Sequence, residues 1–123
     1  MILQDINKQL DKLYSTTQCA DHISIGTRFT VEGDPVNFLF YQDGSKYCSI
    51  VTNRNFSEWI ACSTNGWRKA APLIEKAVKP YGVQWDNEEG RLYIRFRRNE
   101  MTVAQALLCL QQAVYVICEI EFN

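Results

Sequence analysis

Hydrophobic and polar residues alternate along three stretches in the first half of the chain, at residues 22–31, 36–42 and 46–52. A period of two is typical of a strand with one buried face. Turn-forming residues separate the stretches, and Asp43-Gly44 is a strong hairpin signal. The pattern therefore predicts an antiparallel meander of three strands.

Elsewhere the apolar residues recur with a period near 3.6, which is typical of helices. Residues 1–14 place their apolar side chains on one face, so an amphipathic first helix is expected. Asn55, with a glutamate three residues later, predicts the cap of a second helix. A third helix is expected over residues 67–78. Its regular part should begin near Ala71, because a proline follows there.

The second half of the chain predicts two more strands, over residues 83–86 and 91–98. Thr102 and Gln105 have the spacing of a capping box and predict the start of a last helix. This helix is apolar nearly all round, so several of its sides should be buried. Residues 114–122 have strand composition, but no turn-forming residue precedes them. We therefore favour a continued helix over a strand.

The order α-β-β-β-α-β-β-α predicts a single α+β domain over residues 1–123. We expect a two-layer fold, an antiparallel sheet of about five strands with helices mainly on one face. A length of 123 residues with 46% apolar residues indicates one globular domain with a real core. This composition excludes disordered, collagen-like and coiled-coil chains.

No apolar run reaches the roughly 18 residues that a bilayer span requires. The first residues also lack the basic and apolar regions of a secretory signal. We therefore expect a cytoplasmic protein with no membrane partner. The net charge of −1 does not indicate a polyanionic or acidic ligand that binds through the overall charge of the chain.

Five cysteines without a C-x-x-C pair predict free thiols. His22 is the only histidine and follows Cys19 by three residues, which is too few ligands for a tetrahedral metal site. Glycine-rich phosphate-binding motifs are missing as well. We expect no metal, no cofactor and no catalytic residue, since His22 is the only imidazole base and lies on a polar strand face.

An arginine-rich segment over residues 91–98 is the most suggestive feature of the chain, with four arginines and no acid. Strand alternation places several of its residues on the face opposite the core. Guanidinium groups suit carboxylates and phosphates, and tyrosine stacks on bases. Three interpretations remain open: a solvated outer face neutralised by Glu88, Glu89 and Glu100, a site for an acidic protein partner, or a nucleic-acid site. The candidate binding residues here are Arg91, Tyr93, Arg95, Arg97 and Arg98.

Trp59 and Trp67 are two further candidate binding residues. Either they pack in the core, or they are exposed anchors for a partner, because tryptophan is enriched in interface hot spots. The last helix bears on assembly, because its apolar residues between Thr102 and Cys118 cannot all face one sheet. Either the first helix covers the remaining side or a second copy does, and a homodimer is the simpler prediction.

Several short motifs resemble an uncharacterised family of small bacterial and prophage domains. They are I-S-I-G-T-R-F at residues 23–29, G-D at 33–34, D-G at 43–44, a tyrosine-to-threonine segment at 47–52, G-V at 82–83 and A-Q-A-L-L at 104–108. The similarity extends over residues 1–118 and departs at residues 53–55, where the family has an acidic turn. It implies a bacterial or phage origin and an accessory role. The element order also resembles class I chaperones of type III secretion, which are small dimers that hold an extended effector segment.

These observations lead to one hypothesis with two alternatives. The favoured function is that of a non-enzymatic protein-binding accessory module of phage or mobile-element type, and the resemblance extends this to an inhibitor of a host defence effector. The first alternative is a dimeric, secretion-chaperone-like protein. The second is a nucleic-acid binder that uses the arginine-rich strand.

Overall fold

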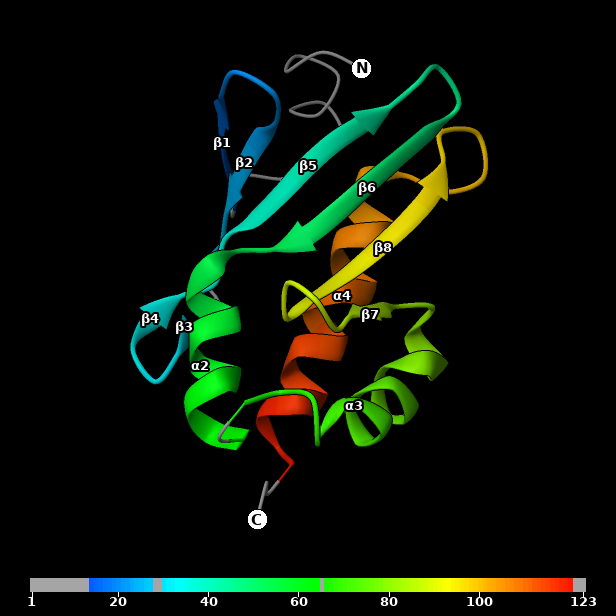
Figure 1. The fold of residues 1–123 in the computed structure, drawn as a ribbon. Helices are drawn as coiled ribbons and strands as arrows, with labels where there is room; N and C mark the ends of the chain where they lie inside the picture. The colour runs from blue at the N-terminus through cyan, green and yellow to red at the C-terminus, as the bar shows by residue number, and fades with distance from the viewer. Residues whose placement is uncertain (1–13, 28–29, 65, 121–123) are drawn as a thin grey trace.

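The computed structural model describes residues 14–27, 30–64 and 66–120, which form an α+β fold (Figure 1). The predicted helix over residues 1–14 lies outside the described residues except for Tyr14. In chain order the elements are β1 (Ser15–Gln18), β2 (Ile23–Gly26), β3 (Thr30–Val31), β4 (Asp34–Pro35), β5 (Phe38–Asp43), β6 (Tyr47–Thr52), α2 (Arg54–Thr64), α3 (Ala71–Val78), the 3-10 turn η1 (Lys79–Tyr81), β7 (Gln84–Asp86), β8 (Arg91–Arg97) and α4 (Val103–Cys118).

Within the described residues, the main sheet has six strands in the order β1-β2-β5-β6-β8-β7, and all neighbouring strands are antiparallel. The predicted meander is confirmed as β2, β5 and β6. The prediction of about five strands was one too few, because β1 was missed. Its sequence Ser-Thr-Thr-Gln contains no apolar residue, so it carries none of the alternation that reveals a strand.

The helices cover one face of this sheet and give the fold two layers. Helix α4 packs against β6 and β8, and α3 packs against α4 and β7. In Figure 1, α4 passes behind β6 and β8. Leu92, Ile94 and Phe96 of β8, which alternate with the residues predicted to face away from the core, are buried in this interface. Phe38 and Phe40 of β5 are buried there too.

Helix α4 is the main cover of the core. Its predicted capping box is present: the Thr102 hydroxyl accepts from the Gln105 backbone N–H, and the Gln105 side chain accepts from the Thr102 N–H. The helix continues to Cys118, which confirms the helical interpretation for residues 114–118, whereas Glu119 and Ile120 lie beyond the helix and residues 121–122 lie outside the described residues. Within the described residues, no helix is both long and apolar enough to traverse a bilayer. The buried residues of α4 are Val103, Ala106, Leu107, Leu110, Ala113, Val114 and Ile117.

The strand predicted over residues 22–31 was too long. Strand β2 ends at Gly26, and residues 30 and 31 instead pair with β4 in a separate two-stranded sheet. Beyond β2 the Thr27 hydroxyl donates to the Val36 carbonyl at 3.1 Å, a side-chain bond outside the ladder. A tight turn at Glu32-Gly33, both with positive φ, then closes the short β3–β4 hairpin. Local hydrogen bonds therefore end the strand at Gly26, although the alternating sequence pattern continues to Val31.

Two helix starts were also tested by the structure. Helix α2 begins at Arg54, and its cap is Asn53 rather than Asn55, because the Asn53 side chain accepts from the Phe56 N–H at 3.3 Å. Helix α3 begins at Ala71 with a proline in its first turn, as predicted. That proline replaces an N–H that would have had no intrahelical partner.

Candidate functional site

The outer face of the sheet, opposite the helices, carries arginine and tyrosine side chains. Along β6 and β8 the inward residues are buried, whereas the alternate residues are half-buried or exposed. Figure 1 shows this face toward the viewer, in front of α4. We call it the arginine–tyrosine face and define it by Tyr41, Tyr47, Tyr93, Arg91, Arg95 and Arg97.

The strand register brings these residues together from distant parts of the chain. Tyr47 of β6 lies opposite Arg97 of β8 and also opposite Asp43 of β5. Tyr93 lies opposite Val51. Side chains that are opposite each other on one sheet face are close enough to interact. The predicted residues Arg91, Tyr93, Arg95 and Arg97 thus share the face with a second set from β5 and β6.

Tyr47 is the centre of the tightest cluster on this face. The guanidinium carbon of Arg95 lies 4.2 Å from the centre of the Tyr47 ring, and that of Arg97 lies 5.3 Å from it. Both distances are within the range of cation–π attraction. The Nε of Arg97 also donates to the Tyr47 hydroxyl at 3.0 Å. This hydrogen bond raises the pKa of Arg97, with a smaller contribution from Glu100.

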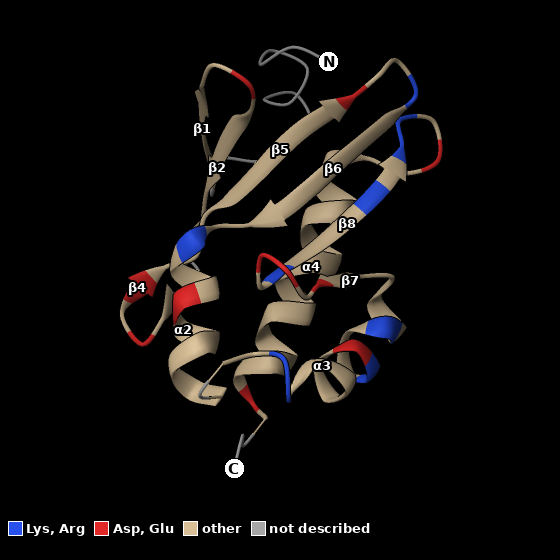
Figure 2. Cartoon of the chain, in the orientation of Figure 1, with Lys and Arg blue, Asp and Glu red and all other residues tan. Residues whose placement is uncertain are grey.

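Arg95 is paired with a carboxylate from another strand. Its Nη2 lies 2.9 Å from Oδ2 of Asp43, and the two side chains are 50% and 61% exposed. An ion pair this open to solvent contributes little to stability. Among the flanking acids proposed to neutralise the segment, Glu100 acts on Arg97, but the partner of Arg95 is Asp43. Figure 2 shows the acid at the end of β5 and the basic stretches of β8.

Arg98 lies beyond the end of β8 and outside the alternating face. Its backbone N–H donates to the Lys46 carbonyl at 3.1 Å, and its Nη1 lies 3.5 Å from the Ser45 carbonyl. Arg98 therefore borders the β5–β6 turn, next to the Tyr47 cluster. It extends the positive charge at this end of the face.

Trp67, a candidate binding residue, is held against the turn between β7 and β8. Its indole Nε1 donates to the Asn87 carbonyl at 2.7 Å, and its ring meets Trp85 edge to face at 6.5 Å. Gly90 lies so close that a Cβ atom there would be 2.7 Å from the indole ring. These contacts favour the packing interpretation of Trp67.

A hollow of about 500 Å³ lies next to this indole. It is open to solvent and combines two cations with one acid. Its lining residues are Ala61, Gly66, Trp67, Arg68, Lys69 and Glu88. The hollow shares no residue with the arginine–tyrosine face.

Trp59, the other candidate tryptophan, lies on α2. Its ring stacks on Phe56 with 5.9 Å between centres, and it lines a small cavity of about 10 Å³ beside β4. Its Nε1 is buried and has no hydrogen-bond partner among the described residues. Trp59 and Trp67 are half-buried and pack against the core. The structure therefore places neither tryptophan on the arginine–tyrosine face.

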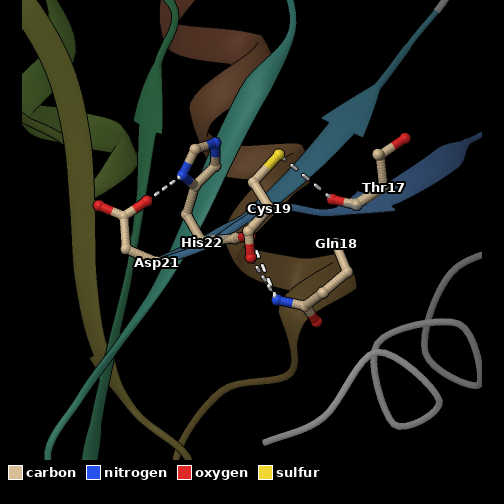
Figure 3. Close-up of polar contacts among 5 residues, drawn as sticks. All are labelled: Thr17, Gln18, Cys19, Asp21 and His22. Carbon is tan, nitrogen blue, oxygen red and sulfur yellow. Dashed lines mark hydrogen bonds and ion pairs between the residues drawn. The ribbon is translucent and has the colours of Figure 1, made fainter.

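His22 and Cys19 lie in the loop between β1 and β2 (Figure 3). The Nδ1 of His22 lies 2.7 Å from the Asp21 carboxylate, and this hydrogen bond lowers the pKa of Asp21. The imidazole also packs on Tyr41, with 5.3 Å between ring centres. The Cys19 thiol instead donates to the Thr17 carbonyl at 3.9 Å. Thiol and imidazole thus have separate partners.

Tyr41 and Tyr47 on the face, and Asp43 beside it, were not among the binding residues predicted from the sequence. Alternation could have found Tyr41, which alternates with the buried Phe38 and Phe40. The Asp43-Gly44 turn then sets the register of the hairpin, which aligns Asp43 with Tyr47. The neighbour relation between β6 and β8 could not be found in this way, because it joins residues about 50 positions apart.

The described residues contain no group of three or more His, Cys, Asp or Glu side chains placed to hold a metal ion. Comparison of the chain with models of protein families, with curated proteins and with solved structures found no match.

Proposed function

We propose that the chain is a non-enzymatic protein-binding module whose partner docks on the arginine–tyrosine face. The observation that carries this proposal is the cluster in which Arg95 and Arg97 both lie against Tyr47. Arginine and tyrosine are enriched among the residues that dominate binding energy at protein interfaces. Leu39 and Val51 are half-buried on the same face, where Val51 lies opposite Tyr93, and they add apolar area. A mixed surface of this kind suits a protein partner.

The biological role remains that of an accessory protein of phage or mobile-element type. We propose it on the resemblance of the motifs between residues 23 and 108, which also suggests inhibition of a host defence effector. The role is a proposal separate from the docking surface, and each is open to its own test.

Single-stranded nucleic acid is the second candidate ligand for the same face. Tyrosine rings stack on bases, and guanidinium groups contact phosphates. Two observations favour protein. The chain has a net charge of −1, and Glu88, Glu89 and Glu100 flank the two ends of the arginine-rich strand, so a long polyanion meets opposing charge.

We also propose a homodimer that uses α4, from Thr102 to Cys118. Leu108 and Tyr115 are 54% and 57% exposed on this helix, although both are large and apolar in character. Between them lies the exposed, uncharged Gln112. The spacing of Gln105, Leu108, Gln112 and Tyr115 is that of a coiled-coil seam, and a seam without charges meets its own copy without repulsion.

Affinity capture from the source organism tests the docking surface. The bait is the wild-type chain beside two variants with the same change in charge. Arg95→Glu with Arg97→Glu reverses two cations on the face, and Arg68→Glu with Lys69→Glu reverses two exposed cations elsewhere. We expect a protein that wild type and the second variant retain and the first variant loses. The affinity should fall at least about a hundredfold, because charge-assisted contacts are lost and repulsion is added.

Equal capture by all three baits would show that the partner docks elsewhere, near Trp59 or the helices, and loss by the second variant alone would place the partner at the hollow beside Trp67. Capture of nucleic acid alone, with affinity that falls linearly in log units as log salt rises, would favour the second candidate.

A further inference from the structure

We infer that the partner presents a carboxylate-bearing, extended acidic segment, and that Asp43 occupies its site in the free protein. This inference rests on the proposed function, because it assigns the chemistry of the same face. It concerns the contact between Arg95, Asp43 and Tyr47.

The side chain of Arg95 extends across β6 to reach Asp43. Arg95 belongs to β8 and Asp43 to β5, and Tyr47 of β6 lies between the two strands. The guanidinium group lies 4.2 Å from the Tyr47 ring centre and donates to the carboxylate at 2.9 Å. A carboxylate in this position is therefore bound by the Arg95 guanidinium group, which also contacts the Tyr47 ring. Asp43 shows directly which ligand chemistry fits.

The Asp43 contact is easy to exchange. Both side chains are at least half exposed, and exposed pairs of this kind are close to neutral in free energy. A carboxylate from a partner can accept the same hydrogen bond from Arg95. Arg97, which also lies against Tyr47, adds a second cation. A planar guanidinium group binds a carboxylate through two parallel hydrogen bonds, whereas the contact with Asp43 uses Nη2 alone.

The surroundings favour a short acidic segment over a continuous phosphate backbone. Arg91, Tyr93, Arg95 and Arg97 occupy every second position of β8, so three charges lie along one line. An extended peptide places alternate side chains on one side in the same way. A phosphate backbone that continued beyond β8 would approach the acidic turn at Glu88 and Glu89 at one end and Glu100 at the other.

The experiment measures binding of a short labelled peptide of alternating Glu and Tyr residues by fluorescence anisotropy. The matched probe has Gln in place of Glu, and a labelled oligothymidylate represents single-stranded nucleic acid. The variants are Asp43→Thr, which removes the competing carboxylate and keeps a residue suited to a strand, and Arg95→Gln. Arg68→Gln, at an exposed cation remote from the face, is the control. Thermal unfolding checks that each variant is folded.

We expect Asp43→Thr to bind the acidic peptide about two- to fivefold more tightly than wild type, because the exposed pair no longer competes. Arg95→Gln should weaken binding by about tenfold or more. Arg68→Gln and wild type should bind equally, and the Gln peptide should bind none of the proteins at the same concentration.

Four results would overturn the inference. Unchanged affinity of Asp43→Thr for the acidic peptide would mean that Asp43 does not compete for the site. Weaker affinity would mean that Asp43 positions Arg95 for the ligand. Failure of wild type and Asp43→Thr to bind the acidic peptide would exclude a carboxylate ligand, and preference for oligothymidylate would assign the face to nucleic acid. The proposed protein-binding function survives the first three results if capture still depends on Arg95 and Arg97. The protein-binding function is refuted separately if capture is unchanged when both Arg95 and Arg97 are replaced.

Discussion

Single residues that join distant parts of the chain hold the turns of this fold in place. Trp67 follows α2, yet its indole is bonded to Asn87 and packed against Gly90 in the turn between β7 and β8. Gly90 has a φ of +69°, in the region that disfavours side chains, and it leaves no space for a Cβ atom. The glycine is therefore required for both conformation and close approach.

Gly90→Ala should destabilise the protein more than Gly44→Ala. Both glycines have nearly the same φ, +69° and +70°, so each substitution costs about 1–2 kcal/mol for the left-handed backbone. At Gly44 a Cβ meets none of the described residues within 4 Å, whereas at Gly90 it meets the Trp67 ring. Overpacking should add roughly 1–3 kcal/mol. Urea unfolding of the two variants measures the difference, and equal losses would show that the indole moves aside freely.

Cys118 makes the stability of the fold sensitive to alkaline pH. Burial raises the pKa of its thiol from 9.0 to about 11, with help from Glu119 and Glu32. The unfolded chain therefore releases this proton at a lower pH than the folded chain does. The contribution to stability is complete below pH 9 and is lost as the pH rises toward 11.

The free energy of unfolding of wild type should thus fall between pH 9 and pH 11 more steeply than that of Cys118→Ala. Urea unfolding at a series of pH values gives both slopes. Parallel slopes would show that Cys118 ionises equally in both states.

At the scale of elements, the alternating pattern predicted β5, β6 and β8 and the inward residues of β8. It failed where polar contacts decide the structure. Strand β1 has no apolar residue to reveal it, and β2 ends where Thr27 bonds to the Val36 carbonyl. The shared face of Arg91, Arg95 and Arg97 followed from alternation alone.

The cluster around Tyr47 did not follow from the sequence, because it depends on which strand lies next to which. β8 pairs with β7 on one side and with β6 on the other. The pairing with β6 brings Arg95 and Arg97 to Tyr47. Pairing between strands far apart in sequence is decided by the packing of the whole core. A local pattern carries no information about it.

The start of α4 should be sensitive to loss of its cap. Thr102→Ala removes the hydroxyl that accepts from Gln105 N–H at 3.1 Å, and such caps contribute about 0.5–2 kcal/mol. Thr102→Ser keeps the acceptor and should remain near wild type. Urea unfolding compares the three proteins. A loss for serine as large as that for alanine would assign the effect to the methyl group of threonine instead.

At the scale of the whole molecule, the two proposed surfaces lie on opposite sides of the fold. The arginine–tyrosine face is the outer side of the sheet, and the exposed stripe of α4 is on the helix layer behind it. Dimerisation through α4 would therefore leave both arginine–tyrosine faces accessible. A dimer of this kind offers two docking surfaces to a partner.

Light scattering after size exclusion tests the dimer. We expect wild type at twice the chain mass of 14.3 kDa and Leu108→Glu at the single mass, because a charge in the seam opposes association. Leu73→Glu, at a leucine of α3 that is 47% exposed, is the matched control and should stay dimeric. Wild type at the single mass at micromolar concentration would refute the proposal.

Because α4 follows all the described strands along the chain, the order of synthesis leaves the sheet uncovered for a time. Phe38, Phe40 and Ile50 of the inner face leave the ribosome well before the helix that buries them. Tyr14 and Gln111, whose side chains lie 3.5 Å apart in the fold, are separated by 97 residues. The core is therefore completed only after α4 has been synthesised, and until then the apolar strands of the nascent chain are open to aggregation.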